Sequence, residues 1–174
     1  MKSFAPAEKE HYLALARRWA ATVTVVTVRR AGEHVAAGQP ELDGFTATAF
    51  LTVSMDPPIV AVSATASSAA SSMLRQSAGF AVNLLSPSQA ELAGSFARPA
   101  QDRVGLFDRI VHQPDAQGAP ILDGAAGAWS ARVRQLVEAG DHLLVLGDVT
   151  AVHLGEGTDT LVYHDRAYGR VSRG

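Results

Sequence analysis

The stretch Gly44 to Pro58, GFTATAFLTVSMDPP, contains both a strand pattern and its end. Small and larger residues alternate in it, and alternation with a period of two is typical of a half-buried strand. Small residues inside a strand often mark the close approach of a flat ligand or of another backbone. The two prolines after Asp56 cannot donate to a strand ladder, so a turn is predicted there. A buried strand, Ile59 to Val62, follows the turn, and we predict a strand pair with a hydroxyl-lined wall.

Upstream of this pair, the sequence predicts one helix and one strand. Glu8 to Ala20 has Tyr12, Ala16 and Trp19 on one helical face, and Thr22 to Val28 is a β-branched run typical of a strand. The polar segment Arg29 to Asp43 is longer than a tight turn needs, and we expect a short strand near Val35.

Downstream, the pattern predicts further strands and two short helices. Ser63 to Ser72 leads into one helix. Ser86, Pro87 and Gln89 form a capping box that begins another, which we expect to reach about Ala97. A short helix is expected around residues 102–108 of an otherwise irregular segment. The predicted strands are Phe80 to Leu85, Ala128 to Glu138, His142 to Leu154, Thr160 to Tyr163 and Tyr168 to Val171.

Seven or eight strands with two or three helices and short turns predict an antiparallel barrel of the mainly-β or α+β class. The length of 174 residues predicts a single domain spanning residues 1–174. The net charge of −2 gives no indication of nucleic-acid or membrane binding. The N-terminal segment is too charged for a signal peptide. The lack of cysteine excludes disulfides and thiolate catalysis and is compatible with a cytoplasmic location, which we expect.

Common catalytic and nucleotide motifs are missing: no G-x-G-x-x-G follows a strand, and there is no G-x-x-x-x-G-K, G-x-S-x-G or H-E-x-x-H. His142, His153 and His164 are evenly spaced but fall on separate predicted elements, so we predict no metal site. The serines of Ser63 to Ser72 fit either a phosphate site or an ordinary helix cap, and residue types alone favour the cap. Residue types alone also favour a plain hairpin turn at Ala139 to His142.

The order of several short motifs resembles that of the flavin reductase-like family, the FMN-binding split barrels. The matching segments are VTVVTV, TATAF with VS-x-DPP, FAVN-L, Q-x-x-LA-x-x-F, PILDG, GDH and YGR, and they cover the chain from Trp19 to Arg170. Four positions depart from the family pattern: Thr48 replaces the usual Asn, Ala49 replaces Ser, Thr22 replaces Gly, and Val104 replaces the Phe of D-R-F.

The resemblance implies an antiparallel Greek-key split β-barrel with a few peripheral helices. It also implies an NAD(P)H:flavin oxidoreductase that reduces FMN or FAD with NADH or NADPH as co-substrate. Such a protein would be a homodimer that supplies reduced flavin to a partner monooxygenase. A flavin- or haem-binding barrel without reductase turnover, and a structural barrel with an empty site, stay open as alternatives.

The resemblance also assigns residues to the two ligands. His142 is expected to be the catalytic residue, in a positioning or electrostatic role, on the nicotinamide side of the flavin. The expected nicotinamide-binding residues are His142, Tyr168, Gly169 and Arg170. The expected flavin-binding residues are Thr46, Ala47, Thr48, Ala49, Phe50, Ser63, Thr65, Ser67, Ser68, Asn83 and Phe96.

Overall fold

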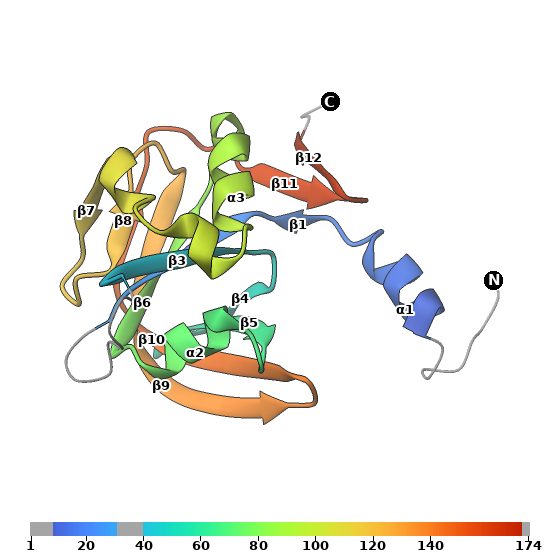
Figure 1. Ribbon diagram of the computed structural model, residues 1–174, viewed down its shortest axis with the longest axis horizontal. Helices are drawn as coiled ribbons and strands as arrows, with labels where there is room; N and C mark the ends of the chain where they lie inside the picture. The colour runs from blue at the N-terminus through green and yellow to red at the C-terminus, as the bar shows by residue number, and fades with distance from the viewer. Residues whose placement is uncertain (1–8, 31–39, 172–174) are drawn as a thin grey trace.

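A seven-stranded antiparallel sheet forms the body of the computed structural model, which describes residues 9–30 and 40–171 (Figure 1). Its strands are β2 (Thr24–Arg29), β3 (Leu42–Ala47), β4 (Phe50–Met55), β5 (Pro58–Thr65), β6 (Gly79–Leu84), β9 (Gly127–Ala139) and β10 (His142–Leu154). Their order across the sheet is β3-β2-β6-β9-β10-β5-β4. Every neighbouring pair is antiparallel, and the long strand β10 lies inside the sheet between β9 and β5, as its apolar pattern predicted.

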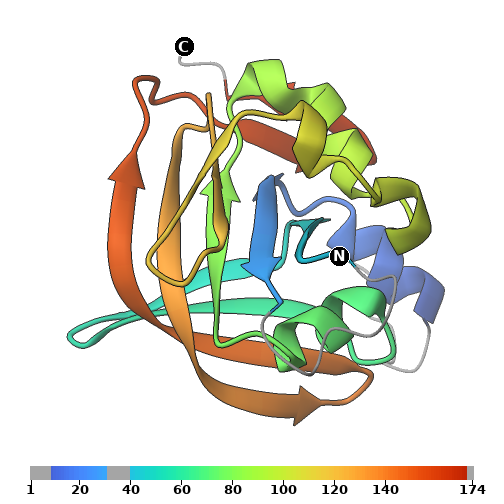
Figure 2. The same ribbon diagram turned by 60° about the vertical axis from the view of Figure 1, so that its left-hand side comes forward.

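The two edges of this sheet meet at a seam. Strands β3 and β4 lie at opposite edges, yet only Thr48 and Ala49 connect them in the chain. The sheet therefore has to curl until its edges come together, which closes the predicted barrel (Figure 2). The Ser63 amide donates to the Ala49 carbonyl at 3.0 Å, which continues the β4–β5 pairing as far as this link.

The sequence prediction treated residues 44–55 as one strand, and this was wrong. The small residues of TATA do not extend a single strand; they mark the corner where the chain passes from one sheet edge to the other. The predicted turn at the prolines is confirmed: β4 and β5 form a hairpin around Asp56 and Pro57, whose peptide bond is cis. This hairpin projects from the barrel in Figure 2.

Two small sheets flank the barrel. β11 (Leu161–His164) and β12 (Ala167–Arg170) pair with each other, and β11 also pairs with β1 (Ala21–Thr22). From the sequence we expected β11 and β12 to complete the main sheet, and this was wrong. They form a separate sheet because β11 pairs with the short strand β1. β7 (His112–Pro114) and β8 (Pro120–Leu122) form a second pair inside the segment predicted to be irregular. That segment also contains the 3₁₀ turns Ala100–Arg103 and Phe107–Arg109.

Three short helices accompany the strands in the described residues: α1 (Lys9–Ala16), α2 (Ala69–Arg75) and α3 (Ala90–Phe96). The helix cap before α3 is confirmed, since the Gln89 side chain accepts from the Ser86 amide at 3.1 Å. Helix α1 is shorter than the predicted Glu8 to Ala20 and buries none of its residues. It stands away from the barrel in Figure 1, which leaves its apolar face open. The strand expected near Val35 lies outside the described residues.

Strand β2 is buried on both faces, which divides the core into two clusters. Val26 and Val28 pack inside the barrel with Phe80 and other buried side chains. Val25, on the opposite face, packs beneath α3 with Phe96. None of the helices in the described part of the chain is long and apolar enough to cross a membrane.

Candidate functional site

A cavity of about 300 Å³ opens at the seam of the barrel, and we call it the seam cavity. Its walls are the link between β3 and β4, the end of β5 with the start of α2, and the start of β10. Eight of the residues predicted to bind flavin or to act in catalysis line it: Thr46, Ala47, Thr48, Ala49, Ser63, Thr65, Ser68 and His142. Phe45, Ala64 and Ala70 also line it and were not predicted, although each lies within two residues of a predicted position.

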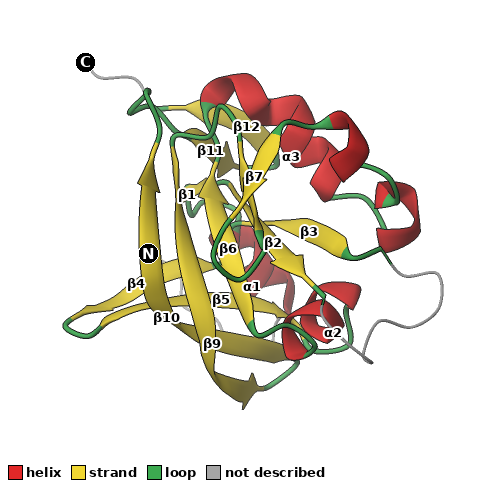
Figure 3. Ribbon diagram, turned by 90° about the vertical axis from the view of Figure 1, so that its left-hand side faces the viewer, coloured by secondary structure: helices red, strands yellow, loops and turns green. Residues whose placement is uncertain are grey.

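Strand register explains how residues far apart in the chain reach this cavity. In the β5–β10 ladder, Thr65 lies opposite His142 and Ser63 lies opposite Leu144. The Ala66 amide donates to the Asp141 carbonyl at 2.9 Å, which holds the β9–β10 turn against the end of β5. The two strands are antiparallel, so β5 runs toward α2 while β10 runs away from it (Figure 3).

His142 forms a hydrogen bond with its neighbour Asp141. His142 Nδ1 lies 2.7 Å from Asp141 Oδ1, and the two side chains are 45% and 90% exposed. The hydrogen bond from His142, followed by its charge, lowers the pKa of Asp141 below its ordinary value. The carboxylate therefore stays ionised at neutral pH and can accept a hydrogen bond from Nδ1–H, which leaves Nε2 for other partners.

Ser68 has a structural role as well as a place in the cavity wall. Its Oγ accepts from the Ser71 amide at 3.2 Å and caps α2, as the helix-cap interpretation predicted. A serine hydroxyl that accepts one hydrogen bond keeps its own proton for donation to an anion. Ser67 is exposed and does not line the cavity.

Small side chains and a hydrogen-bonded threonine form the cavity wall at the end of β3 and the link to β4. The Thr46 hydroxyl donates to the Ala93 carbonyl of α3 at 2.6 Å, so this hydroxyl is already engaged. Ala47 and Ala49 bring only a methyl group each, while Thr48 is exposed on the link. The wall therefore offers methyl groups and backbone to a ligand, together with the free hydroxyl of Thr48.

Three other predicted flavin residues lie away from the cavity. Asn83 is fully buried, and its side chain bonds to Val25, Thr27, Pro120 and Leu122. Phe96 is buried beneath α3, with its ring 5.4 Å from that of Phe107. Phe50 packs on Trp129 at 5.0 Å between ring centroids. Because Asn83 and Phe96 have neither free surface nor free polar atoms, we correct their assignment from flavin contact to core structure.

The three predicted nicotinamide residues Tyr168, Gly169 and Arg170 lie on β12, outside the seam cavity. The ring of Tyr168 lies 5.4 Å from that of Tyr163 on β11. Burial, and then the neighbouring Tyr163, raise the pKa of Tyr168 above its ordinary value, so its phenol is protonated at neutral pH. His142 is therefore the single member of the predicted nicotinamide group that the seam cavity includes.

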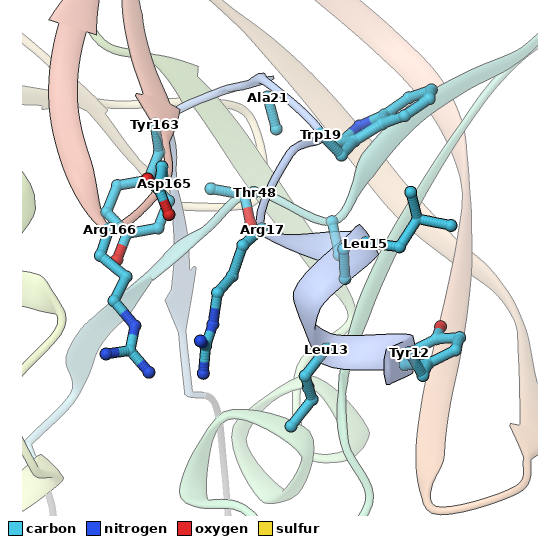
Figure 4. Close-up of a pocket in the computed structure, with 12 residues that line it drawn as sticks. Tyr12, Leu13, Leu15, Arg17, Trp19, Ala21, Thr48, Tyr163, Asp165 and Arg166 are labelled. Atoms are coloured by element: carbon cyan, nitrogen blue, oxygen red, sulfur yellow. The ribbon is translucent and has the colours of Figure 1, made fainter. Parts of the chain in front are cut away.

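A second cavity of about 700 Å³ lies between α1, the segment from Trp19 to Ala21, and the β11–β12 turn (Figure 4). We call it the outer cavity. It shares Thr48 and Ala49 with the seam cavity, so the two cavities lie next to each other at the link between β3 and β4. Sequence reasoning did not find it, because its walls come from three segments that no local pattern connects.

Within the described residues, no three His, Cys, Asp or Glu side chains come close enough together to hold a metal ion. His142 lies at the start of β10, and His153, on the same strand, has Nε2 3.0 Å from Ser130 Oγ. His164 ends β11.

Comparison with known proteins identifies a related family. The pattern of the flavin reductase like domain matches residues 16–172 of this chain. An NADH:FMN oxidoreductase from Rhodococcus qingshengii is 36% identical over 163 residues, which cover 91% of this chain and 80% of that protein. The reductase component of 4-hydroxyphenylacetate 3-monooxygenase from Thermus thermophilus is 31% identical over 163 residues, which cover 94% of this chain and 97% of that protein.

One further relative is much longer than the matched region, and one solved structure has the same fold. A probable flavin reductase from Rhizobium meliloti is 37% identical over 138 residues, and the match covers 79% of this chain but only 42% of that protein. The solved structure of BorF, the flavin reductase component of a bacterial two-component tryptophan halogenase, has a TM-score of 0.81 at 27% identity. The match covers 96% of this chain and 100% of that one. This similarity confirms the split barrel expected from the sequence.

Proposed function

This chain belongs to the flavin reductase-like family, and we propose that it is an NAD(P)H:flavin oxidoreductase that reduces FMN or FAD. The observation that carries this proposal is the seam cavity, which gathers eight residues from three separate segments of the chain. The relatives named above as an NADH:FMN oxidoreductase and a monooxygenase reductase component support the same activity.

The residues of the seam cavity fit a flavin. A flat ring needs a wall without bulky side chains, and Ala47 and Ala49 provide one. A ring edge that carries carbonyl and N–H groups needs short polar partners, which the Thr48, Ser63 and Thr65 side chains supply. The flavin phosphate needs a hydroxyl donor, and Ser68 in the cavity wall can supply one.

A bound flavin supplies the redox chemistry, because it accepts a hydride from the reduced nicotinamide without help from an acid or base of the protein. The chain's own task is to hold two ligands at the right distance and to keep their faces parallel. The rigid β5–β10 ladder serves this purpose, since it fixes His142 opposite Thr65.

His142 is best placed to orient the nicotinamide. Asp141 holds its Nδ1, so the ring has a defined orientation and its Nε2 is left to form a hydrogen bond with a carboxamide, which has both a donor and an acceptor. Tyr168, Gly169 and Arg170 would act from the neighbouring β12 on the same ligand. In this role His142 affects hydride transfer more than flavin affinity.

Turnover assays test the activity and the role of His142 together. Purified protein should oxidise NADH or NADPH in the presence of FMN or FAD, followed at 340 nm without oxygen. His142→Ala should lower the rate while fluorescence titration shows unchanged FMN affinity. His112→Ala, on β7 and outside both cavities, is the matched control. A wild-type protein that binds flavin but oxidises neither nucleotide would refute the reductase activity and favour a flavin-binding module.

The same proposal includes a homodimer. Helix α1 has eight residues and buries none of them, and so short a helix is marginal in water without tertiary contacts. Tyr12 and Leu15 on α1 are 69% and 70% exposed, Trp19 just after the helix is 78% exposed, and Met55 on the edge strand β4 is 95% exposed. A second copy of the chain would cover these apolar side chains.

Sedimentation at micromolar concentration tests the dimer. The wild-type protein should sediment at twice the chain mass of 18.2 kDa. Met55→Glu should shift it toward the monomer if β4 is part of the interface, and because the residue is exposed the fold should survive. A wild-type monomer that still reduces flavin would refute the dimer and leave the activity intact.

Supply of reduced flavin to a separate monooxygenase completes the proposal, and it rests on the relative that is named as a monooxygenase reductase component. The two-component activity predicts that adding such an oxygenase to this protein, NADH and flavin yields hydroxylated product. The cytoplasmic location stays a prediction from the lack of cysteine.

A further inference from the structure

Ser71 is a fully buried polar residue on helix α2. The other buried residues of this helix are Met73 and Leu74, which belong to the core cluster inside the barrel. Burying a hydroxyl without a hydrogen-bond partner costs free energy, and alanine would fill this helical position without that cost. The hydroxyl of Ser71 therefore needs a partner, and the identity of the partner indicates what the serine does.

The partner lies on strand β5 and not within the helix. Ser71 Oγ donates to the Thr65 carbonyl at 2.8 Å, and it lies 3.4 Å from the Ala64 carbonyl. A serine inside a helix usually bonds to a carbonyl one turn earlier in the same helix. Thr65 is the last residue of β5, so this buried hydroxyl joins the helix to the strand.

Three hydrogen bonds form a closed ring at this joint. Ser71 Oγ and the Ser68 amide both donate to the Thr65 carbonyl, at 2.8 and 2.9 Å. The Ser71 amide donates to Ser68 Oγ at 3.2 Å. Thr65 and Ser68 line the seam cavity, whereas Ser71 is not among the lining residues. Ser71 therefore holds two cavity residues from behind the wall.

The same segment is bonded to the wall that carries His142. The Ala66 amide donates to the Asp141 carbonyl at 2.9 Å, and Thr65 lies opposite His142 in the β5–β10 ladder. A shift of the Thr65 carbonyl would therefore move Ser68 relative to His142. The distance between these two side chains depends on the bond that Ser71 makes.

We propose that Ser71 is a positioning residue of the seam cavity. Its buried hydroxyl holds Thr65 and Ser68 at the distance from His142 that a flavin and a nicotinamide require. Ser71 contacts neither ligand, because it is fully buried, and it acts through the two residues that it bonds. The inference rests on the proposed reductase function, because that function places both ligands between these walls.

Flavin titration of Ser71→Ala tests this role. The variant keeps the backbone amide that donates to Ser68 and loses the hydroxyl that bonds to Thr65. Its dissociation constant for FMN, measured by fluorescence, should rise by roughly 3- to 10-fold, as expected for the loss of one hydrogen bond. The rate of NADH oxidation at saturating FMN should fall as well, because hydride transfer depends on a fixed geometry of the two ligands.

Ser77→Ala is the matched control. Ser77 is also a buried serine, and its hydroxyl donates to a backbone carbonyl, that of Leu74 at 3.2 Å. It follows the other end of α2 and lines neither cavity. Both variants should lose roughly 2–4 °C of melting temperature through the lost hydrogen bond. Ser77→Ala should keep the FMN affinity and the turnover rate of the wild type.

Ser71→Cys separates the hydrogen bond from the packing. Cysteine fills a similar volume but has only a weak S–H donor, so FMN affinity should fall in this variant too. Unchanged FMN affinity and turnover in both Ser71 variants would make Ser71 a purely structural residue and overturn the inference. Equal losses of FMN affinity in Ser71→Ala and Ser77→Ala would also overturn it, because general destabilisation would then explain the effect.

The wild-type protein reports separately on the proposed function. A wild type that binds FMN without oxidising NADH or NADPH would refute the reductase activity, and the FMN affinities of the variants would still decide the role of Ser71. A wild type that turns over normally, beside a Ser71→Ala variant that does the same at wild-type FMN affinity, would refute the role of Ser71 alone.

Discussion

Thr48 occupies the most consequential position at the scale of single residues. It is one of the two residues that connect opposite edges of the barrel, and its exposed side chain lines both cavities. The family pattern usually has Asn there, with an amide donor and an acceptor, whereas Thr has one short hydroxyl and a methyl group. The difference lies where a flavin ring edge would be.

Thr48→Asn should tighten binding of oxidised FMN by about 1 kcal/mol, the net value of one ordinary hydrogen bond. Fluorescence quenching during FMN titration measures the change. Thr52→Asn, on the exposed part of β4 and outside both cavities, is the matched control and should bind FMN like the wild type. Unchanged or weaker binding by Thr48→Asn would show that this side chain does not meet the ring.

Ser68 combines a cap with a proposed phosphate contact, and the two roles can be separated. Ser68→Ala should cost about 1 kcal/mol of folding stability through the lost cap. It should also weaken FMN binding by about 1.5–3 kcal/mol, because a hydrogen bond to the charged phosphate is lost. Riboflavin, which has no phosphate, should bind as before. Ser72→Ala, on the exposed side of α2, controls for general effects on that helix. Equal losses for FMN and riboflavin would place the phosphate elsewhere.

Among the secondary-structure elements, strand β10 has to pass a large aromatic side chain. A Cβ atom at Gly147 would lie 2.7 Å from Phe80 Cζ and 2.8 Å from Ala131 Cβ. Phe80 is fully buried, so it has no room to move away. The register of the β9–β10 ladder shifts between Leu146 and Gly147, at the same place. Glycine at this point allows the long strand to curve over the core.

Gly147→Ala should lower the free energy of unfolding by about 1–3 kcal/mol, the usual cost of overpacking a core. Gly94→Ala is the contrasting variant, because an added Cβ in α3 meets no atom within 4 Å. It should raise stability by about 0.5–1 kcal/mol, since alanine favours helix over glycine. Urea unfolding measures both. Stability unchanged in Gly147→Ala would mean that the core adapts around the new methyl group.

At the scale of the whole molecule, one buried carboxylate joins distant parts of the chain. Asp43 on β3 lies 2.8 Å from Arg30 Nη2 and 3.3 Å from Arg103 Nη2, and all three side chains are almost fully buried. Arg103 Nη1 also donates to the Arg98 carbonyl at 2.6 Å. The cluster connects the end of β2 and the 3₁₀ turn Ala100–Arg103 to the edge strand β3, which leads into the seam.

Asp43→Asn should cost about 3–5 kcal/mol of stability, because it leaves two buried arginines without a counter-charge. Glu41→Gln removes the carboxylate of the exposed pair with Arg29, which is about half exposed on both sides, and should change stability by about 1 kcal/mol or less. Thermal and urea unfolding compare the two. Similar, small losses in both variants would show that the Asp43 cluster contributes no more than a surface pair.

Local patterns in the sequence determined most of the strands, the capped helices and the family. The β-branched run in β2, the apolar pattern of β10 and the capping residues before α3 each act through neighbours in the chain. The order of short motifs then identified the family, and with it the residues around the seam cavity.

The tertiary structure decided what depends on contacts between distant segments. Residues 44–55 keep the alternation of one strand, yet they bend at Thr48 and Ala49 because the sheet curls and its edges meet there. Asn83 and Phe96 carry chemistry suited to a ligand, and the packing of β8 and α3 buries them instead. Arg17 and Arg166 are 149 positions apart in the numbering, and the pairing of β1 with β11, with the hydrogen bond from the Asp165 amide to the Arg17 carbonyl, brings them to one cavity. Side-chain burial and cavity walls arise from such long-range contacts, which no local sequence pattern encodes.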